Sequence, residues 1–190
     1  TILFSAAIMQ DVNDSRFPAF AQVYSVGTKG DRPIQFSSMP MEDIVFHPTE
    51  DKILYHDLKG YEDKWRKHHQ SSITRDIWLS ELGEKPTYTK LTSFRGENRN
   101  PVWTSNGKSY FYLSEETGSF NIFKTDIDGS NKKQITDFKE HPVRFLSISN
   151  DDVLSFTYDG EIYTLKEEST PQKLELSIIT DQQEPELKHY

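Results

Sequence analysis

The chain has 190 residues, a net charge of −8 and only 34% hydrophobic residues, although 13% of its residues are aromatic. Disordered segments are poor in aromatic residues, so this composition indicates a folded chain with many half-exposed segments. Alanine occurs four times while serine and threonine are plentiful, which favours strands and turns over a helical bundle. The length fits one domain or a part of a larger one.

The composition also excludes several classes of protein. No stretch approaches the roughly 18–20 apolar residues of a membrane span, and an acidic chain without a basic run is a poor nucleic-acid binder. The absence of cysteine excludes disulfides, a thiolate nucleophile and a cysteine-based zinc site. The chain opens on a strand-like segment without a methionine, so we expect an excerpt of a longer polypeptide whose targeting segment lies outside it.

Strand patterns follow one another along the whole chain. Residues 1–40 contain three of them, at 2–5, 22–24 and 33–36, with an insertion at 11–20. Residues 41–94 contain four, at 43–48, 51–55, 76–78 and 90–92, with an insertion at 59–74. Residues 95–138 contain four at 101–105, 109–113, 120–125 and 133–136, and residues 139–178 contain four at 145–149, 153–157, 161–163 and 172–174. Residues 179–190 are predicted to be a linker or the start of a further element.

These segments are repeats of one unit. Each third strand carries a polar residue, then Ile or Val, then an aromatic residue, as in Asp76-Ile77-Trp78 and Asn121-Ile122-Phe123. Four antiparallel strands in about 40 residues is the size of a propeller blade. The sequence therefore predicts an all-β propeller with four-stranded antiparallel blades, three complete and one lacking its first strand. This is fewer than the roughly four blades of the smallest closed ring, so the chain is predicted to be an arc of a larger one. The alternative is an unrelated meander or sandwich of short strands.

No pattern of a catalytic or metal site accompanies the repeat. There is no G-x-S-x-G elbow and no serine within a strained glycine-rich turn, and none of the six histidines lies near such a site in the sequence. The six histidines lack metal-ligand spacing, and the sequence at 126–129 lacks the further ligands of a calcium loop. Paired carboxylates at 115–116, 151–152 and 167–168 fall in predicted turns or strand ends. The sequence thus predicts no catalytic residue, cofactor or metal.

The insertion at 59–74 is a basic, aromatic island in an acidic chain. Its cations could hold a carboxylate or a peptide C-terminus, and its aromatic residues could anchor a partner protein or domain. The alternative is that the tryptophan packs the loop onto the blade while the charges are solvated. The candidate binding residues in and beside this insertion are Tyr61, Trp65, Arg66, His68, His69 and Arg75.

Several segments resemble a known family. The unit at 101–111, which contains P-V-W-T-S-N-G-K, is similar to the TolB-like, WD-type propeller repeat. The insertion through residue 78, together with His141–Ser147 and Tyr158–Tyr163, resembles bacterial tricorn-like serine peptidases of the carboxy-terminal-processing protease superfamily. The likeness covers nearly the whole chain. It implies the later part of an N-terminal six-bladed propeller, followed in the parent protein by a second propeller, a PDZ domain and a catalytic domain that carries the serine nucleophile.

The resemblance implies a function for the segment. It would be a non-catalytic scaffold and substrate gate for peptide hydrolysis by a distant domain of an exported or periplasmic protein. Its partners would be peptide substrates and other domains of the same chain, with a possible homo-oligomer and neither nucleic acid nor a membrane span. Two alternatives stay open, a stand-alone TolB-like protein-binding propeller and the propeller of a prolyl-oligopeptidase-type enzyme.

Overall fold

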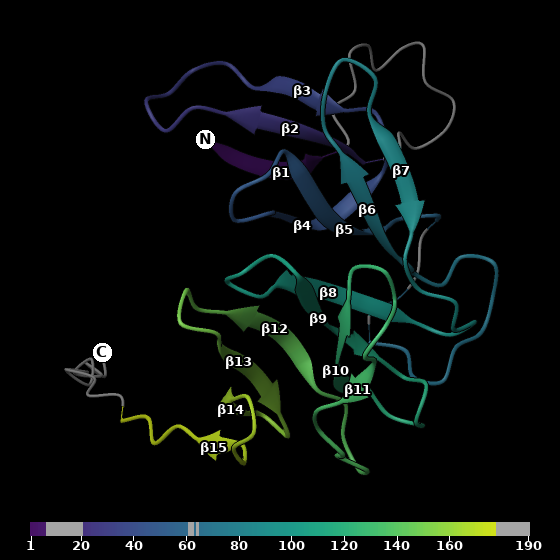
Figure 1. Cartoon of the computed structure of the whole chain (residues 1–190), viewed down its shortest axis with the longest axis vertical. Coiled ribbons are helices and arrows are strands. Elements are labelled where there is room, and N and C mark those ends of the chain that lie inside the picture. The colour runs from purple at the N-terminus through teal and green to yellow at the C-terminus, as the bar shows by residue number, and fades with distance from the viewer. Residues whose placement is uncertain (7–20, 61–62, 64, 178–190) are drawn as a thin grey trace, which may run out of the picture.

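The computed structural model describes residues 1–6, 21–60, 63 and 65–177. Over these residues the chain forms fifteen strands in four antiparallel sheets, and none of the described residues forms an α-helix. Figure 1 shows the sheets following one another from the N-terminal to the C-terminal end of the chain. The predicted all-β class with four-stranded antiparallel sheets is confirmed. The predicted insertion at 11–20 and the segment at 179–190 lie outside the described residues.

Each sheet is built from strands in their chain order. The first has three strands, β1 (Ile2–Ala6), β2 (Gln22–Val26) and β3 (Ile34–Ser37). The second consists of β4 (Met41–Phe46), β5 (Lys52–Asp57), β6 (Ile77–Glu81) and β7 (Thr87–Lys90). The third consists of β8 (Asn98–Trp103), β9 (Ser109–Ser114), β10 (Asn121–Asp126) and β11 (Lys133–Gln134). The fourth consists of β12 (Arg144–Ile148), β13 (Val153–Tyr158), β14 (Glu161–Lys166) and β15 (Gln172–Lys173).

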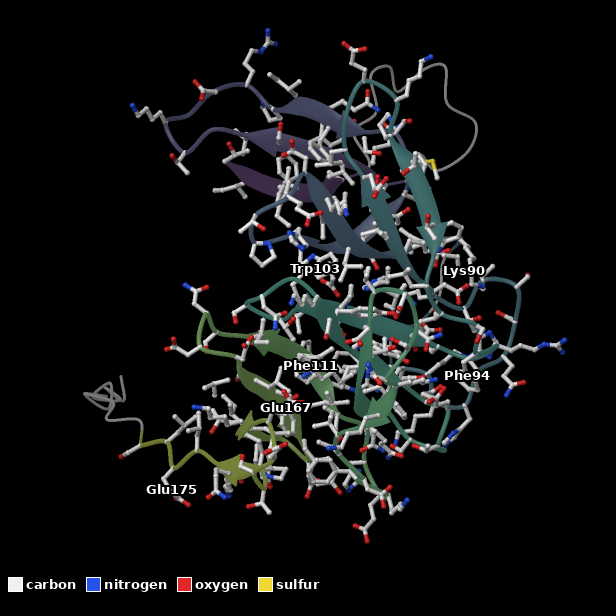
Figure 2. All side chains as sticks on the ribbon, viewed as in Figure 1. Lys90, Phe94, Trp103, Phe111, Glu167 and Glu175 are labelled. Carbon is white, nitrogen blue, oxygen red and sulfur yellow. The ribbon has the colours of Figure 1, made fainter. Side chains whose placement is uncertain are left out.

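The repeated triplet has a structural reason. Its middle residue is Val23, Ile77 or Ile122 in the first three sheets, and each of these side chains is fully buried. Ile77 packs against the next sheet, in a cluster with Trp103 and Tyr110. Because apolar residues on one face of each sheet contact the following sheet, the core lies between the sheets. In Figure 2, Trp103 lies between the second and third sheets, and its indole nitrogen donates to the carbonyl oxygen of Val45 at 3.3 Å.

The outermost strands are shorter or lie earlier than the sequence patterns predict. The pattern at 90–92 predicts a strand where β7 has already ended at Lys90, and β11 ends at Gln134 rather than at 136. In both sheets a threonine two residues after the end of the outermost strand accepts a hydrogen bond from the neighbouring strand through its side chain. The hydroxyls of Thr92 and Thr136 accept the backbone N–H groups of Ile77 and Ile122 at 3.0 and 2.9 Å. A side chain that bonds the backbone replaces the next ladder bond, so the strand ends there.

The first strands of the three later sheets share one irregularity. The pairing register shifts between Glu42 and Val45 in β4, between Arg99 and Val102 in β8, and between Arg144 and Ser147 in β12. Within these bulges Asp43, Asn100 and Phe145 have φ values of +49°, +49° and +55°. A β-bulge bends its strand and re-aims the side chains beside it. The bulges therefore direct equivalent residues of three adjacent sheets toward one region.

Candidate functional site: the bulge rim and the insertion above it

The three bulges line a common cavity of about 1220 Å³. We call six of the residues that they contribute the bulge rim: Glu42, Asp43, Arg99, Asn100, Arg144 and Phe145. The insertion between β5 and β6 adds Asp63 and Trp65 to the lining, and β1 adds Leu3 and Phe4. The cavity therefore joins all four sheets and combines aromatic side chains with charges of both signs.

A buried carboxylate ties the second sheet to the third beneath this rim. One oxygen of Glu97, Oε1, accepts Nη1–H of Arg75 at 2.9 Å and Nε–H of Arg99 at 2.8 Å. The side chains of all three residues are less than a tenth exposed. The other oxygen, Oε2, is buried with no hydrogen-bond partner among the described residues. Because an uncompensated buried charge is costly, the two guanidinium groups and this carboxylate depend on one another.

Next to this cluster, Glu42 pairs with two cationic or potentially cationic side chains. Its Oε2 lies 3.1 Å from Nε2 of the buried His56 and 3.5 Å from Nε of Arg75. The hydrogen bond from His56, followed by the charges of His56 and Arg75, lowers the pKa of Glu42 to about 2 despite partial burial. Glu42 is therefore ionised throughout the neutral and mildly acidic range.

The insertion crosses from the second sheet to the third and fourth. The backbone N–H of His68 donates to both carboxylate oxygens of Glu115, each at 3.1 Å. Burial raises the pKa of Glu115, which is 6% exposed. Farther along, Nη2–H of Arg144 donates to the carbonyl oxygen of Trp65 at 3.4 Å. The Arg144 guanidinium also lies 4.8 Å from the centre of the Trp65 ring. The insertion is thus bonded onto the cavity mouth.

Trp65 forms an aromatic pair at this mouth. Its ring contacts that of Phe145 edge to face, with centroids 6.1 Å apart, yet the two residues are 54% and 57% exposed. Two large aromatic residues that are in contact and still half in water form a surface that a ligand or another domain can cover. Burial also lowers the pKa of the adjacent Arg144, and the charge of Arg99 adds to this effect.

The base of the insertion is anchored by a second ionic cluster. Asp76 Oδ2 accepts from Lys59 at 2.6 Å and lies 2.8 Å from Nζ of Lys90, while Oδ1 accepts from the Thr92 hydroxyl at 3.1 Å. Lys59 also donates to the Thr74 carbonyl oxygen at 2.7 Å, which joins the two ends of the loop. A smaller polar hollow of about 440 Å³ lies here, beside the residues Lys90 and Phe94 that Figure 2 labels.

The structure brings together most of the predicted binding residues. Trp65, Arg66 and His68 are exposed on the insertion, and His69 is half-buried there. Arg75 differs, because it is 5% exposed and holds Glu97, although it still borders the cavity. Tyr61 lies outside the described residues. Nothing in these positions tests binding itself, so the set stays a prediction.

Sequence reasoning did not identify the bulge rim, His56, Glu97 or Glu115 as parts of a site. Glu42, Arg99 and Arg144 stand at equivalent places in three repeats, one or two residues before each predicted first strand. A charged residue at the same place in three repeats is the feature of the sequence that could have indicated the bulge rim. Among the described residues, no group of three or more histidines, aspartates or glutamates is arranged to hold a metal ion. The described residues also contain no helix that is long and apolar enough to cross a membrane.

Comparison with known proteins agrees with this architecture. Residues 5–171 match the family described as the tricorn protease N-terminal β-propeller domain. A tricorn protease homologue from Saccharolobus solfataricus is 26% identical over 133 residues, which is 68% of this chain and 12% of that protein. The crystal structure of the tricorn protease matches 95% of this chain and 16% of its own, with a TM-score of 0.75 and 19% identity.

A TolB-type structure is also similar. The putative TolB from Agrobacterium tumefaciens matches 90% of this chain and 60% of its own, with a TM-score of 0.67 and 17% identity. At these identities the two structures establish the propeller fold, which confirms the predicted fold class. Because the family match covers most of the residues, the chain belongs to the tricorn protease N-terminal β-propeller domain family.

Proposed function

We propose that this chain is a non-catalytic part of a peptidase, a propeller segment that serves as scaffold and substrate gate for a distant catalytic domain. The observation that carries the proposal is the cavity of about 1220 Å³, where three bulges converge beneath an insertion bonded across three sheets. This volume exceeds the roughly 300–1,000 Å³ of small-molecule sites, and its walls alternate aromatic and charged groups. Such a space suits an extended peptide, whereas a folded domain is too large for it.

The candidate binding residues have distinct roles in this proposal. Trp65 offers the exposed ring against which an apolar side chain can stack, and Arg66, His68 and His69 present polar and cationic groups beside it. Arg75 holds the wall in place through Glu97 rather than meeting the peptide from the surface. Tyr61 is assigned to the same surface by its position in the sequence alone.

Further parts of the proposal depend on the family. The complete protein would be an exported serine peptidase, and the partners of this segment would be peptide substrates and the other domains of its own polypeptide. The chain spans 12% of the length of the tricorn protease homologue that it matches, so activity and partners belong to the whole protein.

A stand-alone TolB-like binding propeller is the second candidate function. It is favoured by the TolB-type structure, of which this chain covers 60%, far more than the 16% of the tricorn protease. In that case the same surface would recruit a partner protein rather than admit a substrate.

The coding sequence after residue 190 separates the candidates. A PDZ pattern followed by a catalytic serine supports the peptidase proposal, and an early stop codon supports the TolB-like alternative. A G-x-S-x-G elbow would instead indicate a prolyl-oligopeptidase-type enzyme. The purified 190-residue chain should not hydrolyse peptides, and hydrolysis that persists in active-site controls would overturn its non-catalytic role.

Variants of the complete protein test the gate. We expect Trp65→Ala and Arg66→Ala to lower kcat/KM for long unstructured peptides by about threefold to tenfold, the loss of roughly 1 kcal/mol of binding. Hydrolysis of very short peptides should change less, because they touch less of the surface. Tyr88→Ala is the matched control, since Tyr88 is an aromatic residue on β7 that is 41% exposed and lies outside the cavity lining. Equal kinetics for all three variants would exclude the insertion as a substrate surface.

A further inference from the structure

His56 occupies an unusual place in the cavity wall. It lies on β5, is 3% exposed, and its ring faces the bulges of two different sheets. The register pairs His56 with Glu42 on β4 and with the apolar Ile77 on β6. Glu42 and Asp43 of β4 and the backbone of Asn100 on β8 lie beside the ring nitrogens. Arg75, in the segment before β6, lies near the same Glu42 oxygen as His56.

The hydrogen bonds define the tautomer of the neutral ring. The backbone N–H of Asn100 can only donate, so Nδ1 of His56, at 3.4 Å, must be the acceptor. The ring proton is then on Nε2, which donates to Glu42 Oε2 at 3.1 Å. In this state the imidazole joins β5 of the second sheet to the bulge of the third.

Protonation would rearrange this hydrogen bonding. When Nδ1 of the ring also carries a proton, it can no longer accept the Asn100 N–H and becomes a donor. A carboxylate oxygen, Asp43 Oδ2, lies 3.4 Å from Nδ1 and can accept from it. The imidazolium would be held between Glu42 and Asp43, both on β4, while the Asn100 N–H would lose its partner across the boundary. The side-chain amide of Asn100, which also bonds Asp43 Oδ2, would then compete with the imidazolium for that oxygen.

We propose that His56 is a pH-sensitive link between the second and third sheets, which bonds the two bulges when neutral and releases the Asn100 amide when protonated. Histidine is the side chain through which proteins most often respond to a change of pH, and both ring nitrogens of His56 have hydrogen-bonding groups beside them. Because the released amide lines the cavity, acidification would loosen the wall between these two sheets. The inference concerns this wall and holds whether or not the chain admits peptides.

The corresponding positions of the neighbouring sheets provide an internal control. The residue that pairs with Arg99 is Leu113, and the residue that pairs with Arg144 is Thr157, so neither matches His56 as a titratable group. The bulge amide of Phe145 should therefore behave differently from that of Asn100, although both residues have the same backbone conformation.

Hydrogen exchange of the complete protein tests the link. We expect protection of the Asn100 amide, corrected for the intrinsic pH dependence of exchange, to fall about tenfold between pH 7.5 and 5.5, because protonation of the imidazole removes its hydrogen-bond acceptor. Protection of the Phe145 amide should stay constant. In His56→Gln the fall should vanish, and in His141→Gln, a change of an exposed histidine, it should remain.

Asp43→Asn provides a second test that leaves the imidazole in place. It removes one of the two anions that would hold the imidazolium, so the fall in Asn100 protection should shift to lower pH. This variant decides the question if His56→Gln fails to fold. Unchanged protection in the wild type, or an identical pH-dependent fall in His56→Gln or at Phe145, would overturn the proposal.

Discussion

The second and third sheets have the same arrangement of four strands, but they carry different polar residues at the beginning of their third strands. Asp76 lies immediately before β6, and its counterpart Asn121 is the first residue of β10; each accepts a hydrogen bond from a threonine hydroxyl, Thr92 or Thr136. Asn121 completes its bonding with neutral groups, because its amide donates to the carbonyl oxygens of Ser119 and Phe138 at 3.2 and 3.0 Å. Asp76 instead forms ion pairs with two lysines, Lys59 and Lys90.

This difference coincides with the insertion. An anion at position 76 compensates the charges of both Lys59, at the first end of the loop, and Lys90, at the end of the outermost strand. The third sheet, with the short connection 115–120 in place of the insertion, uses an amide at this position. Positions 76 and 121 are thus equivalent but have different roles. The amide of Asn121 caps the end of a strand, whereas the carboxylate of Asp76 anchors a loop.

Exchanging the amide for the carboxylate should have the largest effect. In Asn121→Asp a carboxylate oxygen would face the carbonyl oxygens of Ser119 and Phe138, which now accept from the amide, so we expect the free energy of unfolding to fall by about 3–5 kcal/mol at pH 7.5. Urea denaturation of the complete protein measures it. Burial raises the pKa of such a carboxyl group in the folded state, so the loss should shrink as the pH falls toward 5. A loss no larger than that of Asp76→Asn would contradict the comparison.

The reciprocal exchange should cost less. Asp76→Asn keeps an oxygen for the Thr92 hydroxyl, but Lys59 and Lys90 lose their anionic partner. Because the lysine side chains are 31% and 44% exposed, they can turn to water, and we expect a loss of only about 1–2 kcal/mol. The same denaturation experiment with Lys90→Met as control should show a smaller loss, since one lysine then still compensates Asp76.

The two threonines offer a test in which both sheets should agree. Thr92→Val and Thr136→Val each remove the hydroxyl that accepts the N–H of the β6 or β10 isoleucine and donates to residue 76 or 121. We expect each to lower the free energy of unfolding by about 1–2 kcal/mol. Calorimetry of the two variants should give similar values, and a large difference would show that the threonines do not have equivalent roles.

The sequence predicts the features that depend on neighbouring residues, but not those that depend on contacts between distant ones. The repeat predicted the strands because apolar spacing and turn residues such as Asn106-Gly107 act locally, and the basic, aromatic insertion stood out by composition alone. The ion pair of Arg75 with Glu97 and the hydrogen bond from the His68 backbone N–H to Glu115 join residues 22 and 47 positions apart. Such pairs depend on how neighbouring sheets are placed, which no local pattern contains. The position of the bulges was equally hidden, since Asp43 and Asn100 are residue types that favour a positive φ whereas Phe145, which has the same backbone conformation, is not.

The attachment of the insertion to the third sheet should produce the smallest effect on overall stability. Glu115→Ala removes the acceptor of the His68 N–H, so we expect trypsin to cleave at Arg66 or Lys67 about fivefold to tenfold faster in the folded protein. Its neighbour gives the matched control, Glu116→Ala, which should leave the rate unchanged. Equal rates in the two variants would show that Glu115 does not hold the loop.

The proposed function requires that peptides meet this chain at the bulge rim beneath the insertion. Photo-crosslinking of the complete protein with an unstructured peptide that carries a benzophenone group, followed by mass spectrometry, tests the claim most directly. We expect cross-links at residues 63–75 and 144–145, reduced in Trp65→Ala. Cross-links confined to the turns at the other ends of the first strands, 47–51, 104–108 and 149–152, with none at the rim, would contradict the claim.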